Sequence, residues 1–155
     1  MRKHGLTAAG LLLVTAVILL PVVAGGRAQA NVGHSCSATD KQFISTAQVN
    51  LSSLNLWAGQ YLQGDAKAGE VVAQARQAAA IVRKTEPRDP SLAKTRALLN
   101  SMFTEYARAI QAEAHHRDAG PHIYRAYGLA NFAHDVLVQA KPALAARGWD
   151  IEPLL

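Results

Sequence analysis

The amino-acid sequence predicts an all-α protein, an antiparallel up-down-up-down four-helix bundle that follows a secretory signal peptide. Three observations favour this fold class. Apolar residues recur at spacings of three and four in four long segments, the segments are separated by short turns rich in glycine, proline and aspartate, and no segment alternates with the period of two expected of a strand. Long amphipathic helices with short connections typically pack as an antiparallel bundle, in which each helix lies beside the next.

The first 30 residues have the layout of a secretory signal peptide. Arg2 and Lys3 make a basic start, a long apolar segment follows, and Ala28-Gln29-Ala30 places small residues where a signal peptidase cleaves. The apolar segment is about as long as the ~20 residues that span a bilayer, so an uncleaved membrane anchor is the alternative. Cleavage after Ala30 implies a mature protein that is secreted, periplasmic or associated with the cell wall.

A flexible leader, residues 31–38, follows the expected cleavage site and contains Cys36, the only cysteine of the chain. A single cysteine excludes an internal disulfide, and in an exported protein it indicates a free thiol or an intermolecular disulfide. The residues before Cys36 match a lipoprotein signal poorly, because the apolar segment already ends at Ala24. We therefore expect contact with a membrane only if the signal stays uncleaved or Cys36 is lipidated.

The charge that remains after removal of the signal peptide is small. The chain has 16 Lys and Arg residues against 11 Asp and Glu residues. Three of the basic residues and none of the acidic ones precede residue 31, which leaves 13 basic against 11 acidic residues and a net charge of +2. No basic block remains that would bind nucleic acid. The mature chain is long enough for one domain with a core of its own.

The bundle is expected over residues 39–148, and residues 149–155 are expected to form a C-terminal tail. Gly64 and Asp65 supply a helix end and a new cap, and Asp89 and Pro90 suit the start of a helix. Pro142 should kink the last helix or split off its final turn. The four helices are expected at about 39–63, 65–85, 90–117 and 121–147.

Helical spacing places three polar side chains on the inward face of the third expected helix. At 100° per residue, Tyr106, Glu113 and His116 lie within about 40° of Leu99, the centre of the apolar face. Glu113 and His116 also have the Glu-x-x-His spacing that carboxylate-bridged di-iron bundles use. Those bundles need a second copy of this motif, which the fourth expected helix lacks, so a di-iron centre is disfavoured. A transition-metal site at Glu113 and His116 stays open.

The fourth expected helix contributes His134, which lies about 40° from Ala130 at the centre of its apolar face. If the chain reverses between the third and fourth helices, residues whose numbers sum to about 239 lie side by side. Tyr106 is then level with His134, and Glu113 is level with Tyr127. The favoured interpretation is a hydrogen bond between Tyr106 and His134 inside the bundle, because buried polar groups usually find a partner.

The same two residues are the candidate ligands of a haem. Haem iron takes His or Tyr as an axial ligand, and Tyr106 and His134 are both predicted to point inward. The chain has no C-x-x-C-H motif, so covalent attachment of the c type is excluded. We expect no cofactor, and a haem or a transition metal is the alternative.

These features favour a non-enzymatic function. The sequence shows neither a nucleophile placed beside a base nor a glycine-rich phosphate loop. We expect an exported α-helical bundle that acts in the cell envelope or outside the cell by binding an envelope or extracellular partner, and a homodimer stays open. The alternative function is a carrier of haem or of a transition metal.

Overall fold

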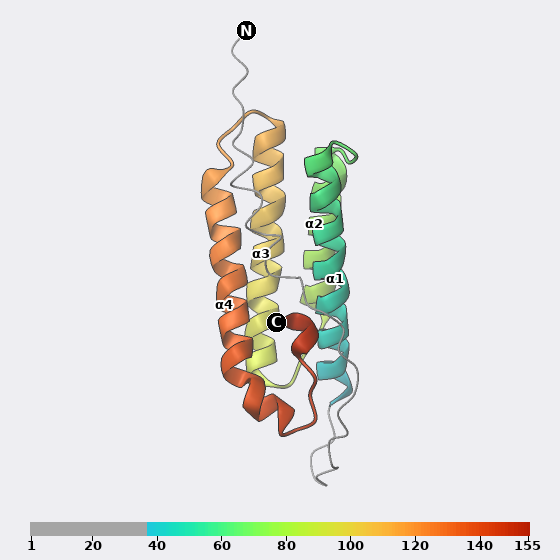
Figure 1. Ribbon diagram of the computed structural model, residues 1–155, viewed down its shortest axis with the longest axis vertical. Coiled ribbons are helices and arrows are strands. Elements are labelled where there is room, and N and C mark those ends of the chain that lie inside the picture. Colours follow the sequence, from blue (N-terminus) through green and yellow to red (C-terminus); the bar gives the residue numbers. More distant parts are fainter. Residues whose placement is uncertain (1–36) are drawn as a thin grey trace.

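The computed structural model describes residues 37–155. The predicted signal peptide, most of the predicted leader and Cys36 lie outside the described residues. The part of the chain that is described forms four helices and no strand, and the helices pack as a bundle (Figure 1). The predicted all-α class with four helices is confirmed. None of these helices is both long enough and apolar enough to cross a bilayer.

Local capping interactions determine where the helices begin. Ser37 Oγ accepts a hydrogen bond from the Asp40 amide at the first turn, and the Glu70 carboxylate accepts one from the Lys67 amide at 2.7 Å. Asp89 Oδ1 caps the third helix by accepting from the amides of Ser91 and Leu92. In chain order the elements are α1 (Ala38–Gln63), α2 (Ala68–Lys84), α3 (Pro90–Ala114), α4 (Gly120–Ala145) and the short 3-10 helix η2 (Glu152–Leu154).

Two helices are shorter than expected because their turns bond back to the preceding helix. At the end of α1, Gly64 adopts φ 84°, and the amides of Asp65 and Ala66 donate to the Gln60 carbonyl, so α2 begins only at Ala68. At the end of α3, His116 adopts φ 55° and the Arg117 amide donates to a carbonyl one turn earlier, so α3 ends at Ala114. The helix α4 continues through Pro142, and Figure 1 shows its last turns changing direction.

The core lies around α3, which packs along both α2 and α4, whereas α1 packs mainly on α2. The largest fully buried side chains include Tyr106, Phe103 and Leu92 of α3 and Phe43 of α1. The helix α2 faces them with small residues, which lets its backbone approach closely; its buried residues are Val71, Ala75, Ala78, Ala79 and Val82.

The last seven residues contribute three side chains to the core, although the sequence pattern indicates only a tail. Trp149, Ile151 and Leu154 are buried, and η2 contacts α1. In Figure 1 this segment lies between α1 and the α3–α4 pair. The helices α1 and α4 are not among the pairs in extensive contact, so the C-terminal segment supplies packing that a direct α1–α4 contact would otherwise provide.

A buried aspartate joins the start of α1 to the connection between α2 and α3. Asp40 is 3% exposed, and its Oδ1 accepts from the backbone amides of Arg88 at 2.6 Å and Asp89 at 3.1 Å. Its other oxygen accepts from the Ser37 hydroxyl at 2.8 Å. Asp89 in turn pairs with Arg147 just after α4 at 2.6 Å. Three separate parts of the chain are thus held together at one end of the bundle.

Candidate functional site

Two unpartnered oxygen atoms inside the bundle mark the candidate site. Tyr106 is 1% exposed, and its hydroxyl forms no hydrogen bond with any described residue. Oε2 of Glu113 is also buried without a partner in the described part of the chain. A buried polar group that stays unsatisfied costs about 1–3 kcal/mol. Both atoms come from α3, so the two unsatisfied polar groups lie on the same helix.

Helix geometry brings a third residue to these two. Tyr106 and Glu113 are seven residues, or about two turns, apart, so they project from the same face of α3. Tyr61, near the end of α1, lies close enough that the charge of Glu113 acts on it, and Tyr61 also acts on Tyr106. Because α1 also contacts α3, we group the three residues and call them the interior site.

Burial and charge keep both phenols of the interior site protonated. Burial is the main cause that raises the pKa of Tyr106 far above its ordinary value of 10.0, and the neighbouring Glu113 carboxylate adds to the rise. The pKa of Tyr61 is raised first by burial, then by the charge of Glu113 and by the side-chain hydrogen bond with Glu113. The interior site is thus one carboxylate beside two neutral hydroxyl groups.

The predicted hydrogen bond between Tyr106 and His134 is wrong, and the reason is the register of α3 against α4. The numbers of residues that meet across these helices, Glu105 with His122 and Lys94 with Phe132, sum to 227 and 226 rather than 239. His134 is therefore level with the first turns of α3, about 20 Å along the helix from Tyr106. In Figure 1, α3 extends beyond the start of α4.

The facing of His134 also differs from the expectation. Its side chain is 40% exposed and lies 3.8 Å from the Asp135 carboxylate. The buried residues of α4 place the centre of its buried face about 80° from His134 rather than about 40°; they are Ala126, Ala133, Leu137 and Leu144. His134 is thus neither level with Tyr106 nor directed into the core.

The predicted neighbours of Glu113 also change. The same register separates Glu113 from Tyr127 of α4, and its neighbour is Tyr61 of α1. His116, which we expected on the inward face, is exposed, because the chain leaves the helix before it. Among residues 37–155, no group of three or more His, Cys, Asp or Glu side chains is arranged to hold a metal ion.

A second polar cluster, which the sequence did not indicate, ties α3 to the start of α4. Glu105 is 8% exposed; its Oε1 accepts from Arg108 at 2.6 Å, and its Oε2 lies 2.7 Å from Nδ1 of His122. A carboxylate only accepts, so Nδ1 of His122 carries the proton. The hydrogen bond from His122 is the main cause that lowers the pKa of Glu105; Arg108 and Arg125 also lower it, while burial opposes them.

Replacement of Glu105 should expose this lowered pKa as a pH-dependent loss of stability. Glu105→Gln should lower the free energy of unfolding by about 1–2 kcal/mol at pH 7, because charge-assisted hydrogen bonds are lost. The folded-state pKa lies below the ordinary value of 4.5, so the carboxylate stabilises the fold above pH 4.5, and this contribution disappears as the pH falls through the folded-state pKa. Urea denaturation at pH 7 and at pH 3 measures both values. An equal difference at the two pH values would contradict the prediction.

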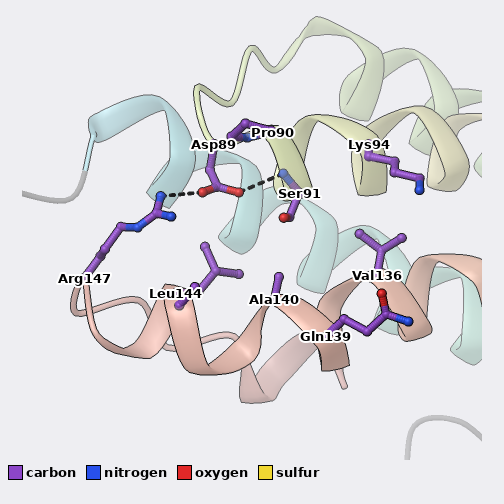
Figure 2. A pocket seen from close by; sticks show the side chains of 10 residues that line it. Asp89, Pro90, Ser91, Lys94, Val136, Gln139, Ala140, Leu144 and Arg147 are labelled. Atoms are coloured by element: carbon purple, nitrogen blue, oxygen red, sulfur yellow. Dashed lines mark hydrogen bonds and ion pairs between the residues drawn. The ribbon is translucent and has the colours of Figure 1, made fainter.

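A groove at the other end of the bundle lies between the start of α3 and the end of α4 (Figure 2). Its carboxylate is already engaged, because Asp89 caps α3 and pairs with Arg147. The Lys94 amine lies over the Phe132 ring, 5.9 Å from its centre. Apart from the polar Gln139, the remaining lining is small or apolar, with Val136, Ala140 and Leu144 among its residues. These residues pack the two helices together and cap α3. The interior site lies on the opposite half of α3.

Comparison with known proteins leaves the function open. No protein-family model matches the chain, and neither a curated protein nor a solved structure matches it. What the chain does is therefore inferred from its own residues.

Proposed function

We propose that the protein is an exported, non-enzymatic, antiparallel four-helix bundle that works in the cell envelope or outside the cell by binding another molecule. One observation carries the binding proposal: the Tyr106 hydroxyl and Oε2 of Glu113 are buried, and no described residue satisfies them. Leaving these two oxygen atoms without hydrogen bonds destabilises the folded chain. A ligand that forms those hydrogen bonds would remove this cost and stabilise the native state.

A non-enzymatic role is proposed because the other buried carboxylates are engaged in holding the fold. Asp40 accepts from the backbone between α2 and α3, and Asp89 caps α3 and pairs with Arg147. Glu105 is held by Arg108 and by His122. A general acid or base must exchange a proton with a substrate. These carboxylates instead form hydrogen bonds with neighbouring elements of the fold.

The export proposal rests on the basic, apolar and small-residue segments of the first 30 residues. Sequencing of the N-terminus of the protein released by its own host tests it. A chain that begins at Asn31 supports the proposal. An intact Met1 in the membrane fraction, or a lipid on Cys36, would overturn it.

The ligand itself is tested on protein purified from its own host. Small molecules released by denaturation of the wild type are compared by mass spectrometry with those released from Tyr106→Phe. We expect a molecule that the wild type carries and the variant lacks. A wild-type protein that releases no small molecule or metal would overturn the binding proposal.

Tyr106→Phe should also show that the hydroxyl is unpartnered. The variant removes a buried group that no described residue satisfies, so the ligand-free protein should be as stable as the wild type or more stable by up to about 1 kcal/mol. Chemical denaturation measures this difference, and Tyr124→Phe, at a tyrosine that is 78% exposed, is the matched control. A loss of 1 kcal/mol or more, on the order of one good hydrogen bond, would show that the hydroxyl is already bonded.

A carrier of haem or of a transition metal is the second candidate function. The unpartnered oxygens of Tyr106 and Glu113 favour it, because tyrosine and carboxylate oxygens both ligate iron. The ligands would then come from Tyr61, Tyr106 and Glu113, since His134 and His116 lie elsewhere. Metal analysis and an absorption spectrum of protein from its own host test this candidate. A protein without bound metal and without a Soret shift on haem titration would exclude it.

A further inference from the structure

We infer that the interior site, Tyr61 with Tyr106 and Glu113, binds a small organic ammonium ion. This inference rests on the proposed binding function and names the chemical class of the ligand. It follows from the charge of the site, from the hydrogen bonds that its atoms lack and from the aromatic surface beside them.

The negative charge of the interior site favours a positively charged ligand. Glu105 and Asp89 each have basic partners, whereas none of the ion pairs within residues 37–155 involves Glu113. Both phenols stay neutral, because burial and the Glu113 carboxylate raise the pKa of Tyr106 and of Tyr61. The site thus carries the charge of one carboxylate. A single positive charge balances it, whereas a divalent or trivalent metal ion usually draws on several anionic ligands.

The two unpartnered oxygen atoms favour a ligand that donates hydrogen bonds. Oε2 of Glu113 can only accept, and the buried hydroxyl of Tyr106 has free acceptor capacity. A primary ammonium group carries three N–H donors, so one such group can serve several oxygens. An anion would instead place a second negative charge beside the Glu113 carboxylate, at further cost.

Aromatic side chains supply the remaining surface. The site contains two phenol rings, and Trp57 lies one turn before Tyr61 on α1, where both side chains pack against the core. Cations are attracted to the faces of Tyr and Trp rings, most strongly where water is excluded. A carboxylate beside aromatic rings therefore recognises an alkylammonium group by its charge and by its apolar chain together.

Titration calorimetry of the mature protein, residues 31–155, with n-butylammonium chloride tests the inference. We expect saturable binding of n-butylammonium, and no binding of n-butanol or of sodium butyrate, which share its alkyl chain without the positive charge. Glu113→Gln should weaken binding at least about tenfold, because a charge-assisted hydrogen bond is lost. Glu86→Gln removes the same charge from an exposed residue and should leave the affinity unchanged.

Three results would overturn the inference: no saturable binding of n-butylammonium, equal binding of n-butanol, or unchanged affinity in folded Glu113→Gln. Tyr61→Phe provides a second variant of the same site if Glu113→Gln does not fold, and it too should weaken n-butylammonium binding. If protein from its own host carries a neutral molecule or a metal that depends on Tyr106, the proposed binding function stands and the ammonium inference fails. If that protein carries nothing, the binding function fails as well.

Discussion

Trp149→Ala is expected to lower the free energy of unfolding by about 3 kcal/mol, as a core substitution would. Trp149 is 7% exposed and lies in the C-terminal segment that packs against the bundle. Truncation of a buried aromatic residue typically costs about 3–5 kcal/mol, and the lower end applies here because the indole N–H is buried without a described partner. A tail residue in solvent would change stability by less than about 0.5 kcal/mol.

Urea denaturation followed by circular dichroism measures this loss. Trp149→Phe is the matched control, because it keeps an aromatic ring in the core and removes the unpartnered N–H; its loss should be well below that of Trp149→Ala. Ile151→Ala, at a residue that is 2% exposed, should be destabilising by about 2 kcal/mol or more. If all three variants are as stable as the wild type, the C-terminal segment does not belong to the core.

The contribution of this segment could not be read from the sequence. Periodicity identifies a helix or a strand when several turns or alternations repeat, and residues 149–155 are too few for either pattern. Trp149, Ile151 and Leu154 follow each other at spacings of two and three, which match no single face. The long helices were predictable for the opposite reason, because each repeats its apolar spacing over several turns and has a cap or a proline near its start.

The inward direction of Tyr106 and Glu113 was also predictable, whereas their neighbours were not. A position on the apolar face depends only on the residue's own helix, but a neighbour depends on the register between helices. The turn after α3 was expected near residue 119, and the left-handed conformation of His116 ends the helix earlier, so α4 begins lower against α3. This shift separated His134 from Tyr106 and brought His122 to Glu105.

Glu105 was missed because α3 is buried on more than one side. It lies about 120° from Leu99, the centre of the predicted apolar face, where a surface helix would meet solvent. The helix α3 packs on α4 as well as on α2, so this flank is covered too. The sequence shows only a glutamate next to the inward-facing Tyr106, and periodicity assigns that glutamate to the surface.

Asp40→Ala is expected to lower the free energy of unfolding by about 2–4 kcal/mol, the largest polar effect in the fold. The carboxylate accepts from the amides of Arg88 and Asp89, and its loss leaves both donors without this acceptor in a region that is largely buried. Each buried donor without a partner costs about 1–3 kcal/mol. Asp40→Asn keeps a carbonyl oxygen at the same position, so its loss should be smaller, while Asp135→Ala, at a side chain that is 68% exposed, should change little.

Hydrogen exchange locates the effect of Asp40→Ala within the fold. Asp40 links α1 to the connection between α2 and α3, and α1 otherwise packs mainly on α2. Local opening of α1 should therefore become easier, and its amides should exchange faster relative to wild type than those of α4. Because α1 carries Tyr61, the same variant should weaken n-butylammonium binding although Asp40 lies at the far end of the helix from the interior site. Uniformly faster exchange in all four helices would show that Asp40 supports the whole bundle rather than the attachment of α1.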